Sequence, residues 1–123
     1  MNQIKILIAG CNSHILSTTI KEDIESLGKY TVNSIGSLDN LSVSMALDKP
    51  NVVILHFHVF THNALEVSQE LYDNYDVPSI LMIDSESFRE PVELIESPHV
   101  LGCITTQFSI EEIQEILNIH IKH

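Results

Sequence analysis

Basic residues are scarce in this sequence. Six lysines and arginines stand against 17 aspartates and glutamates, which gives a formal net charge of −11 over 123 residues. Binding of nucleic acid requires a cluster of cations that contacts the phosphates, and six scattered cations do not form one. We therefore expect no nucleic acid to bind this chain. The acidity predicts solubility without identifying a partner.

Cysteines and long apolar runs are also few. Cys11 and Cys103 lie far apart, without CxxC or zinc-finger spacing, which predicts two free thiols in a reducing compartment. No apolar run reaches the ~18 residues that a membrane span needs, and residues 1–5 enter a strand-like run without a charged leader. We expect a cytoplasmic protein with no membrane partner. The 44% of hydrophobic residues excludes intrinsic disorder.

Strand-like and helix-like runs alternate along the whole chain. The apolar, β-branched runs predict five strands, over residues 4–9, 30–35, 51–57, 77–83 and 100–105. Apolar residues at helical spacing predict five helices, over residues 13–27, 38–47, 61–72, 87–95 and 109–121. Alternation with short connections predicts one α/β domain over residues 1–123. The expected architecture is a flavodoxin-like three-layer sandwich with a five-stranded parallel sheet, in the order 2-1-3-4-5, and five helices.

Individual residues refine these helices. Ile15 is expected on the inward face of the first helix, and Met45 and Ala46 on that of the second. Ser109 and Glu112 have the spacing of a capping box, which predicts the start of the last helix.

Any site in such a sheet is expected outside the carboxyl ends of the strands. The residues at those ends are Gly10-Cys11-Asn12, His56-Phe57-His58, Ile83-Asp84-Ser85 and Thr105-Thr106-Gln107.

These strand ends and the segments around them resemble the receiver domain (CheY-like) of bacterial response regulators over the whole chain. The segments that carry the resemblance are residues 5–9 followed by Asn12, residues 48–55, residues 77–80 and residues 102–109 followed by two glutamates. The more specific pieces are Lys49-Pro50 before the third strand and Phe108-Ser109 before the last helix. Their order and spacing match the family.

The resemblance implies a pocket whose working residues are all replaced. Receivers hold Mg²⁺ on an acidic pair after the first strand and phosphorylate an aspartate after the third. A Thr or Ser after the fourth strand and a Lys after the fifth bind the phosphoryl group. Those positions are here Gly10 and Cys11, His56, Ile83, and Thr106, and the aromatic switch position is Cys103.

Such a pocket supplies neither the carboxylate oxygens that Mg²⁺ needs nor a lysine that neutralises a phosphoryl group. The resemblance therefore predicts a degenerate pseudo-receiver that is not an enzyme and has no catalytic residue, metal or cofactor.

His56 and Cys11 leave a second interpretation open. They follow neighbouring strands, and with His58 and His62 they could form a metal site. A thiol–imidazole pair could instead sense redox state or a small ligand, because an imidazolium and a helix N-terminus both lower a thiol pKa. The simpler expectation is that His56 fills the vacated pocket with local hydrogen bonds, while Asp84 caps the following helix.

Receivers commonly pair through the face built from the fourth helix, fifth strand and fifth helix, and the resemblance implies such a face here. Its members would include Leu101, Ile104, Glu111, Glu112 and Glu115. A monomer with a solvated acidic helix is the alternative. We expect a phosphorylation-independent regulatory module that acts by protein–protein interaction or dimerisation in bacterial signal transduction or transcription control. If the chain is part of a longer protein, the resemblance implies a C-terminal DNA-binding output domain.

Overall fold

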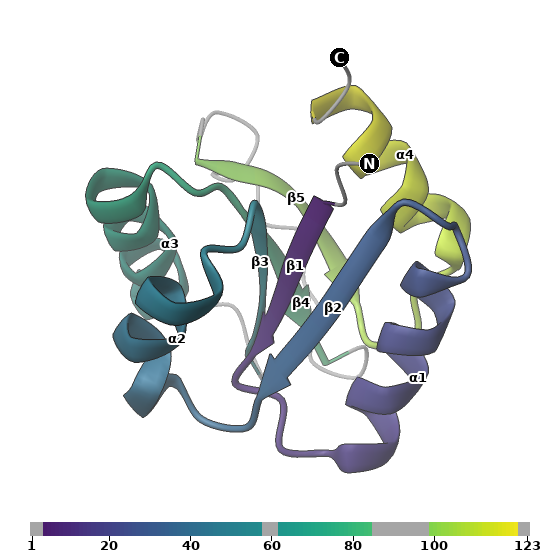
Figure 1. Cartoon of the computed structure of the whole chain (residues 1–123), viewed down its shortest axis with the longest axis horizontal. Helices are drawn as coiled ribbons and strands as arrows, with labels where there is room; N and C mark the ends of the chain where they lie inside the picture. The colour runs from purple at the N-terminus through teal and green to yellow at the C-terminus, as the bar shows by residue number, and fades with distance from the viewer. Residues whose placement is uncertain (1–3, 58–61, 85–98, 121–123) are drawn as a thin grey trace.

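A five-stranded parallel sheet runs through the middle of the molecule (Figure 1). The computed structural model describes residues 4–57, 62–84 and 99–120. The strands are β1 (Ile4–Ala9), β2 (Tyr30–Ile35), β3 (Val52–Phe57), β4 (Ser79–Ile83) and β5 (Val100–Thr105). Their order in the sheet is β2-β1-β3-β4-β5, with all four pairings parallel. The predicted strand order is confirmed.

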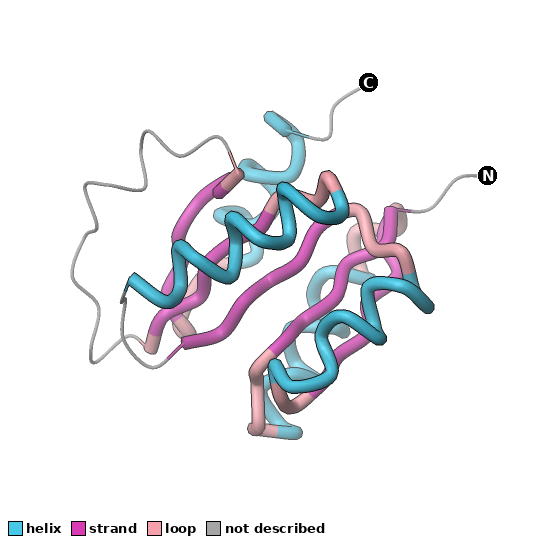
Figure 2. Tube along the Cα trace, turned by 90° about the vertical axis from the view of Figure 1, so that its left-hand side faces the viewer, coloured by secondary structure: helices cyan, strands magenta, loops and turns pink. Residues whose placement is uncertain are grey.

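Helices cover both faces of this sheet, as Figures 1 and 2 show together. One face carries α1 (His14–Glu25) and α4 (Ile110–His120). The other carries the 3₁₀ turn η1 (Leu38–Asn40), α2 (Leu41–Asp48) and α3 (His62–Tyr75). The three-layer sandwich is therefore as predicted. The helix expected over residues 87–95 lies outside the described residues.

The core consists of two apolar layers, because side chains of each strand alternate between the two faces. Ile54 and Met82 belong to the layer beneath α1 and α4. Val53 and Leu81 belong to the layer beneath α2 and α3. The four residues from Val52 onward in β3 are all fully buried, which is typical of a central strand covered on both sides.

Side-chain caps begin two of the helices. The Oγ of Ser13 accepts a hydrogen bond from the Leu16 N–H at 3.1 Å, at the N-terminus of α1. At α4 the Ser109 N–H donates to Oε1 of Glu112 at 2.9 Å, while the Glu112 N–H donates to Oγ of Ser109 at 3.4 Å. These reciprocal bonds confirm the predicted capping box.

Two expectations about inward-facing residues are wrong. Ile15 is 80% exposed, because α1 turns Ile20 and Ile24 toward the sheet instead. Ala46 is exposed, since the segment expected as one helix begins with the tighter turn η1 and α2 buries Met45. A 3₁₀ turn has three residues per turn, and it changes the phase of the residues that follow.

The free edge of β2 is closed by α1. The backbone N–H of Val32 donates to Oε2 of Glu25 at 3.0 Å, and its carbonyl accepts from Nζ of Lys21 at 2.9 Å. Lys21 and Glu25 also form an ion pair at 3.0 Å. Unpaired N–H and C=O groups on an edge strand invite pairing with another chain. At Val32 the two side chains satisfy both groups.

At the other side of the sheet α4 lies close against β5. A Cβ built on Gly102 would be 2.8 Å from Cδ1 of Ile116, which is closer than carbon atoms approach in practice. The missing side chain of Gly102 therefore lets Ile116 pack directly on the strand.

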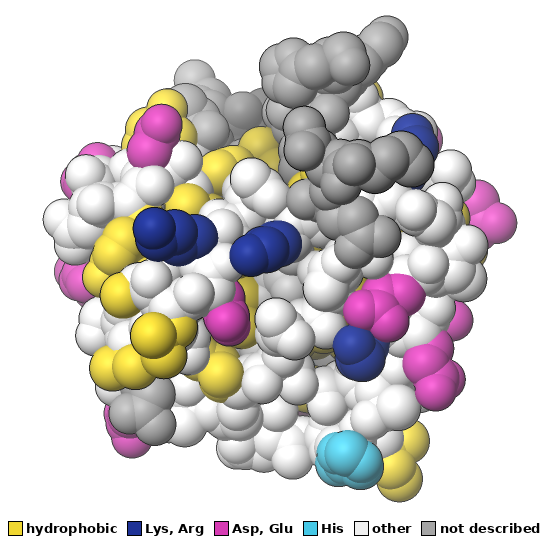
Figure 3. Space-filling view, viewed as in Figure 1, with side chains coloured by type: hydrophobic (Ala, Val, Ile, Leu, Met, Phe, Trp, Pro, Cys, Tyr) yellow, Lys and Arg dark blue, Asp and Glu magenta, His cyan; other side chains and the backbone are white. Residues whose placement is uncertain are grey.

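Hydrophobic side chains also reach the surface. Val43 and Leu47, four residues apart on α2, are 54% and 77% exposed. Figure 3 shows hydrophobic side chains gathered on the side of the molecule where α2 lies. Within the described part of the chain, no helix combines the length and the apolar character needed to cross a membrane.

Candidate functional site at the carboxyl ends of the strands

Gly10 makes the turn that follows β1. Its φ of +84° lies in the left-handed region, which glycine adopts without steric penalty and other residues rarely adopt. Its N–H donates to the carbonyl of Ile35 at 3.1 Å and so continues the pairing with β2. A Cβ at this position would lie 3.1 Å from the backbone oxygen of His56. The backbone at Gly10 is therefore unsuited to any side chain, including a carboxylate.

His56 and Asp84 form a side-chain pair across the ends of β3 and β4. The Nε2 atom of His56 lies 2.7 Å from Oδ1 of Asp84. The two side chains are 11% and 19% exposed, so both are largely shielded from solvent. Partial burial strengthens a hydrogen bond between a carboxylate and an imidazole, and makes either partner costly to leave alone.

Strand register explains why these two residues meet. His56 is opposite Met82 in the β3–β4 pairing, and side chains two residues apart in a strand share a face. Asp84 follows β4 two residues beyond Met82, with its N–H bonded to the Phe57 carbonyl at 3.3 Å. It therefore stands diagonally opposite His56 on the face that carries α1 and α4. The prediction that His56 is hydrogen-bonded locally agrees with this contact.

Cys11 does not have the environment of a reactive thiol. The residue is 4% exposed, and its Sγ lies 3.7 Å from the backbone oxygen of Ser13. Burial raises the pKa of the Cys11 thiol; its backbone hydrogen bond with Ser13 opposes this, and the charge of Asp84 adds to it. The expectation of a lowered thiol pKa is wrong, because the neighbouring carboxylate and the burial both disfavour a thiolate.

The remaining pocket positions are apolar or engaged through their backbone. Ile83 is fully buried in β4. The Thr106 N–H donates to the Ile83 carbonyl at 3.0 Å, which brings the ends of β4 and β5 together. Cys103, which the resemblance aligns with the switch residue, is half-buried and opposite Leu81, and burial raises the pKa of its thiol to about 11.

A metal site formed by the described residues alone finds no support in this geometry. Among the residues that the structure describes, no group of three His, Cys, Asp or Glu side chains could hold a metal ion. His58 and the side chain of His62 lie outside that part of the chain.

The proposed interaction face is altered by the packing of β5 and α4. Ile104 is 2% exposed and belongs to the core, so its assignment to a surface is wrong. Leu101 is half-buried, and the Glu112 carboxylate is bonded to the Ser109 N–H within the capping box. Glu111, Glu112 and Glu115 are all exposed on α4.

The pairing of Asp84 with His56 is the feature that the sequence did not reveal. Both residues stand at carboxyl ends of strands that the fold places side by side, and that adjacency was the available signal. Two further buried polar groups lie at the opposite edge of the sheet. Among the described residues, the Ser79 hydroxyl and both ring nitrogens of His99 have no hydrogen-bond partner.

Comparison with known proteins gives matches among solved structures only, since no protein-family model and no curated protein matches the chain. One similar structure is the signal receiver domain of a putative LuxO repressor protein from Vibrio parahaemolyticus, with TM-score 0.77 and 15% identity over 98% of this chain and 91% of that one.

A receiver domain (CheY-like) from Methylobacillus flagellatus has TM-score 0.74 and 14% identity over 96% of this chain and 98% of that one. The receiver domain of the putative response regulator NarL from Mycobacterium tuberculosis has TM-score 0.72 and 12% identity over 100% of both chains. Sheet order, layers and these neighbours agree: the chain has the fold of a response-regulator receiver domain.

Proposed function

We propose that this chain is a receiver-like regulatory module of bacterial signalling or transcription control that works without phosphorylation, by binding a protein partner or a second copy of itself. The observation that carries the proposal is the contact of 2.7 Å between His56 and Asp84. In the proposed alignment, His56 stands where a receiver has its phosphoaccepting aspartate. An imidazole has no carboxylate oxygen, so His56 cannot form the acyl phosphate that a receiver forms on its aspartate.

The charge balance of the pocket supports this reading. Gly10 and Cys11 replace the acidic pair. Asp84 is the carboxylate found among Gly10, Cys11, His56, Ile83, Asp84 and Thr106 at the strand ends, and it is already bonded to His56. Mg²⁺ binds through several oxygen ligands, of which carboxylates are the usual protein contribution. Without the metal and with Thr106 in place of the lysine, the charge of a phosphoryl group would not be neutralised.

The backbone at Gly10 adds a second, independent support. Its left-handed φ and the nearby His56 carbonyl oppose any side chain at that position. The turn after β1 therefore opposes a carboxylate at the first position of the acidic pair, and a substitution at Gly10 alone would not recreate the pocket.

The proposal is tested by light scattering coupled to size-exclusion chromatography, over a range of protein concentrations. We expect the oligomeric state to be unchanged when acetyl phosphate and Mg²⁺ are added, with an ordinary receiver domain as the positive control. A shift in molar mass that requires the phosphodonor would contradict a phosphorylation-independent module.

A further inference from the structure

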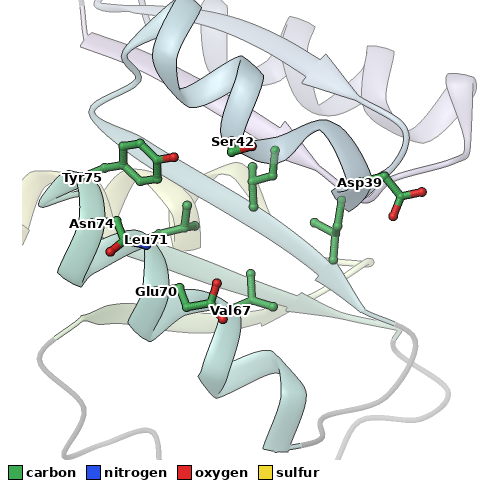
Figure 4. A pocket seen from close by; sticks show the side chains of 9 residues that line it. Asp39, Ser42, Val67, Glu70, Leu71, Asn74 and Tyr75 are labelled. Carbon is green, nitrogen blue, oxygen red and sulfur yellow. The ribbon is translucent and has the colours of Figure 1, made fainter.

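A hollow of about 250 Å³ lies between η1 and α2 on one side and α3 on the other. It is on the opposite face of the sheet from Asp84 and His56. Figure 4 shows the labelled side chains of α3 along one wall, with Ser42 and Asp39 on the facing wall. Figure 2 shows α2 and α3 next to each other in front of the strands. The hollow is therefore a groove between neighbouring helices.

The floor of this groove is apolar. Leu38 and Leu41 contribute to the floor from the side of η1 and α2, and Val67 and Leu71 contribute from the side of α3. Val67 and Leu71 are four residues apart and so share one face of α3. Tyr75 closes the end of the groove and is 39% exposed, with its ring available to a partner. A groove of this volume accommodates one or two apolar side chains.

The elements around the groove are acidic without exception. Five carboxylates belong to η1, α2 and α3: Asp39, Asp48, Glu66, Glu70 and Asp73. These three elements contain no lysine or arginine. Asp39 and Glu70 line the groove itself, and both are exposed. The apolar floor is thus bordered by the carboxylates of Asp39 and Glu70.

This charge identifies the kind of occupant. A second copy of the chain would bring another surface of a molecule with net charge −11 against the acidic rim, and like charges oppose that contact. The phosphates of a nucleic acid would be repelled for the same reason. A positively charged protein segment with an apolar face can pack its apolar side chains on the floor and pair its cations with the carboxylates of the rim.

We propose that the groove between α2 and α3 is a docking site for a basic amphipathic segment of a partner protein. One or two apolar side chains of that segment enter between Leu41 and Val67, and its lysines or arginines lie beside Asp39 and Glu70. The proposal rests on the proposed function in one respect, namely that the module binds a protein, and it names the chemistry of that partner.

The test is a selection from a random 16-residue peptide library displayed on phage, with the full chain as the target. Peptides are then compared for binding to the Glu70→Lys variant and to Glu22→Lys, which makes the same change at an exposed residue of α1, on the other face of the sheet. Circular dichroism and thermal unfolding establish that both variants fold.

We expect the selected peptides to carry net positive charge and at least one large apolar residue. Glu70→Lys should weaken their binding about ten-fold or more, the effect of reversing one charged contact, and Glu22→Lys should leave it nearly unchanged. Neutral or acidic peptides, or no groove-dependent peptide, would overturn the proposal. Peptides that bind both variants equally would also overturn it, while leaving protein binding through another face intact.

Discussion

The Nε2 atom of His56 lies 2.7 Å from Oδ1 of Asp84, and the contact ties the end of β3 to the end of β4. Both side chains are mostly shielded from water. Under the proposed function, this pair stands at the position where a receiver has its phosphoaccepting aspartate. From this relationship and from the local geometry around it we derive the predictions below.

Removing His56 and Asp84 separately and together measures their coupling. We expect a double-mutant cycle with His56→Ala and Asp84→Ala to give a coupling free energy of about 1–3 kcal/mol, because each single change leaves a partly buried polar group without its partner. Urea unfolding monitors the four proteins. The exposed pair Gln69 and Asp73, 2.9 Å apart on α3, is the control and should couple by only a few tenths of a kcal/mol. Equal coupling in the two cycles would contradict the structural role of His56.

Two glycines have a left-handed backbone, but only one of them lies close to another part of the chain. Comparing alanine substitutions at the two positions therefore separates the conformational penalty of the left-handed φ from the penalty of a close contact. Gly10 and Gly28 have φ values of +84° and +88°, yet a Cβ at Gly28 would have no atom within 4 Å. Gly28→Ala should therefore lower the free energy of unfolding by about 1 kcal/mol, the conformational penalty alone. Gly10→Ala should cost more, because its Cβ also presses on the His56 carbonyl. The free energies from urea titration would be compared, and an equal loss in both variants would show that the turn can shift.

Acid should weaken the contact between α1 and the edge of β2. The N–H of Val32 and the Lys21 ammonium hold the pKa of the Glu25 carboxyl below its ordinary value of 4.5. Because the folded state has the lower pKa, this stabilisation is present above about pH 4.5 and is lost as the pH falls through the folded-state value.

Urea midpoints of the native chain and of Glu25→Gln should accordingly differ at pH 7 and converge toward pH 3. Glu22→Gln, which removes a carboxylate from an exposed position on the same helix, is the control. A difference between native chain and Glu25→Gln that persists unchanged at pH 3 would argue against the role of the Glu25 charge.

The buried hydroxyl of Ser79 should be a destabilising feature. The side chain is fully buried, and the hydroxyl has no hydrogen-bond partner in the part of the chain that the structure describes. Ser79→Ala removes this unsatisfied group and should raise the free energy of unfolding by about 1 kcal/mol. Ser34→Ala, at an exposed position of β2, should change it by less than about 0.5 kcal/mol. Destabilisation by Ser79→Ala would mean that a buried water or another group bonds the hydroxyl.

The layout of the fold was predictable from the sequence because of its regular alternation. The wholly apolar run at Val52–Leu55 is typical of a central strand covered on both faces, and Ser109 with Glu112 marks the start of α4. The phase of the helices was harder to predict. Ile15 is apolar yet exposed, since α1 turns Ile20 and Ile24 toward the sheet.

The position of the candidate site could be predicted from the sequence, but the contacts between its side chains could not. Parallel strands bring Gly10, His56 and Thr106 to one edge, and this follows from topology alone. Asp84 has two plausible uses, capping the next helix or pairing across the strands. The register of β3 with β4, which places Met82 opposite His56, brings about the pairing, while the segment after Asp84 lies outside the described residues. The raised pKa of Cys11 likewise depends on the burial that the packed structure reveals.

The central claim is tested most directly by intact-mass spectrometry after incubation with acetyl phosphate and Mg²⁺, on the native chain and on His56→Asp. We expect both proteins to remain unmodified, because Gly10, Cys11 and Thr106 still supply neither metal ligands nor a lysine, and an aspartate at position 56 would face the Asp84 carboxylate. An ordinary receiver domain treated in parallel should acquire a phosphoryl group. A stable phosphoryl adduct on the native chain would contradict a phosphorylation-independent module.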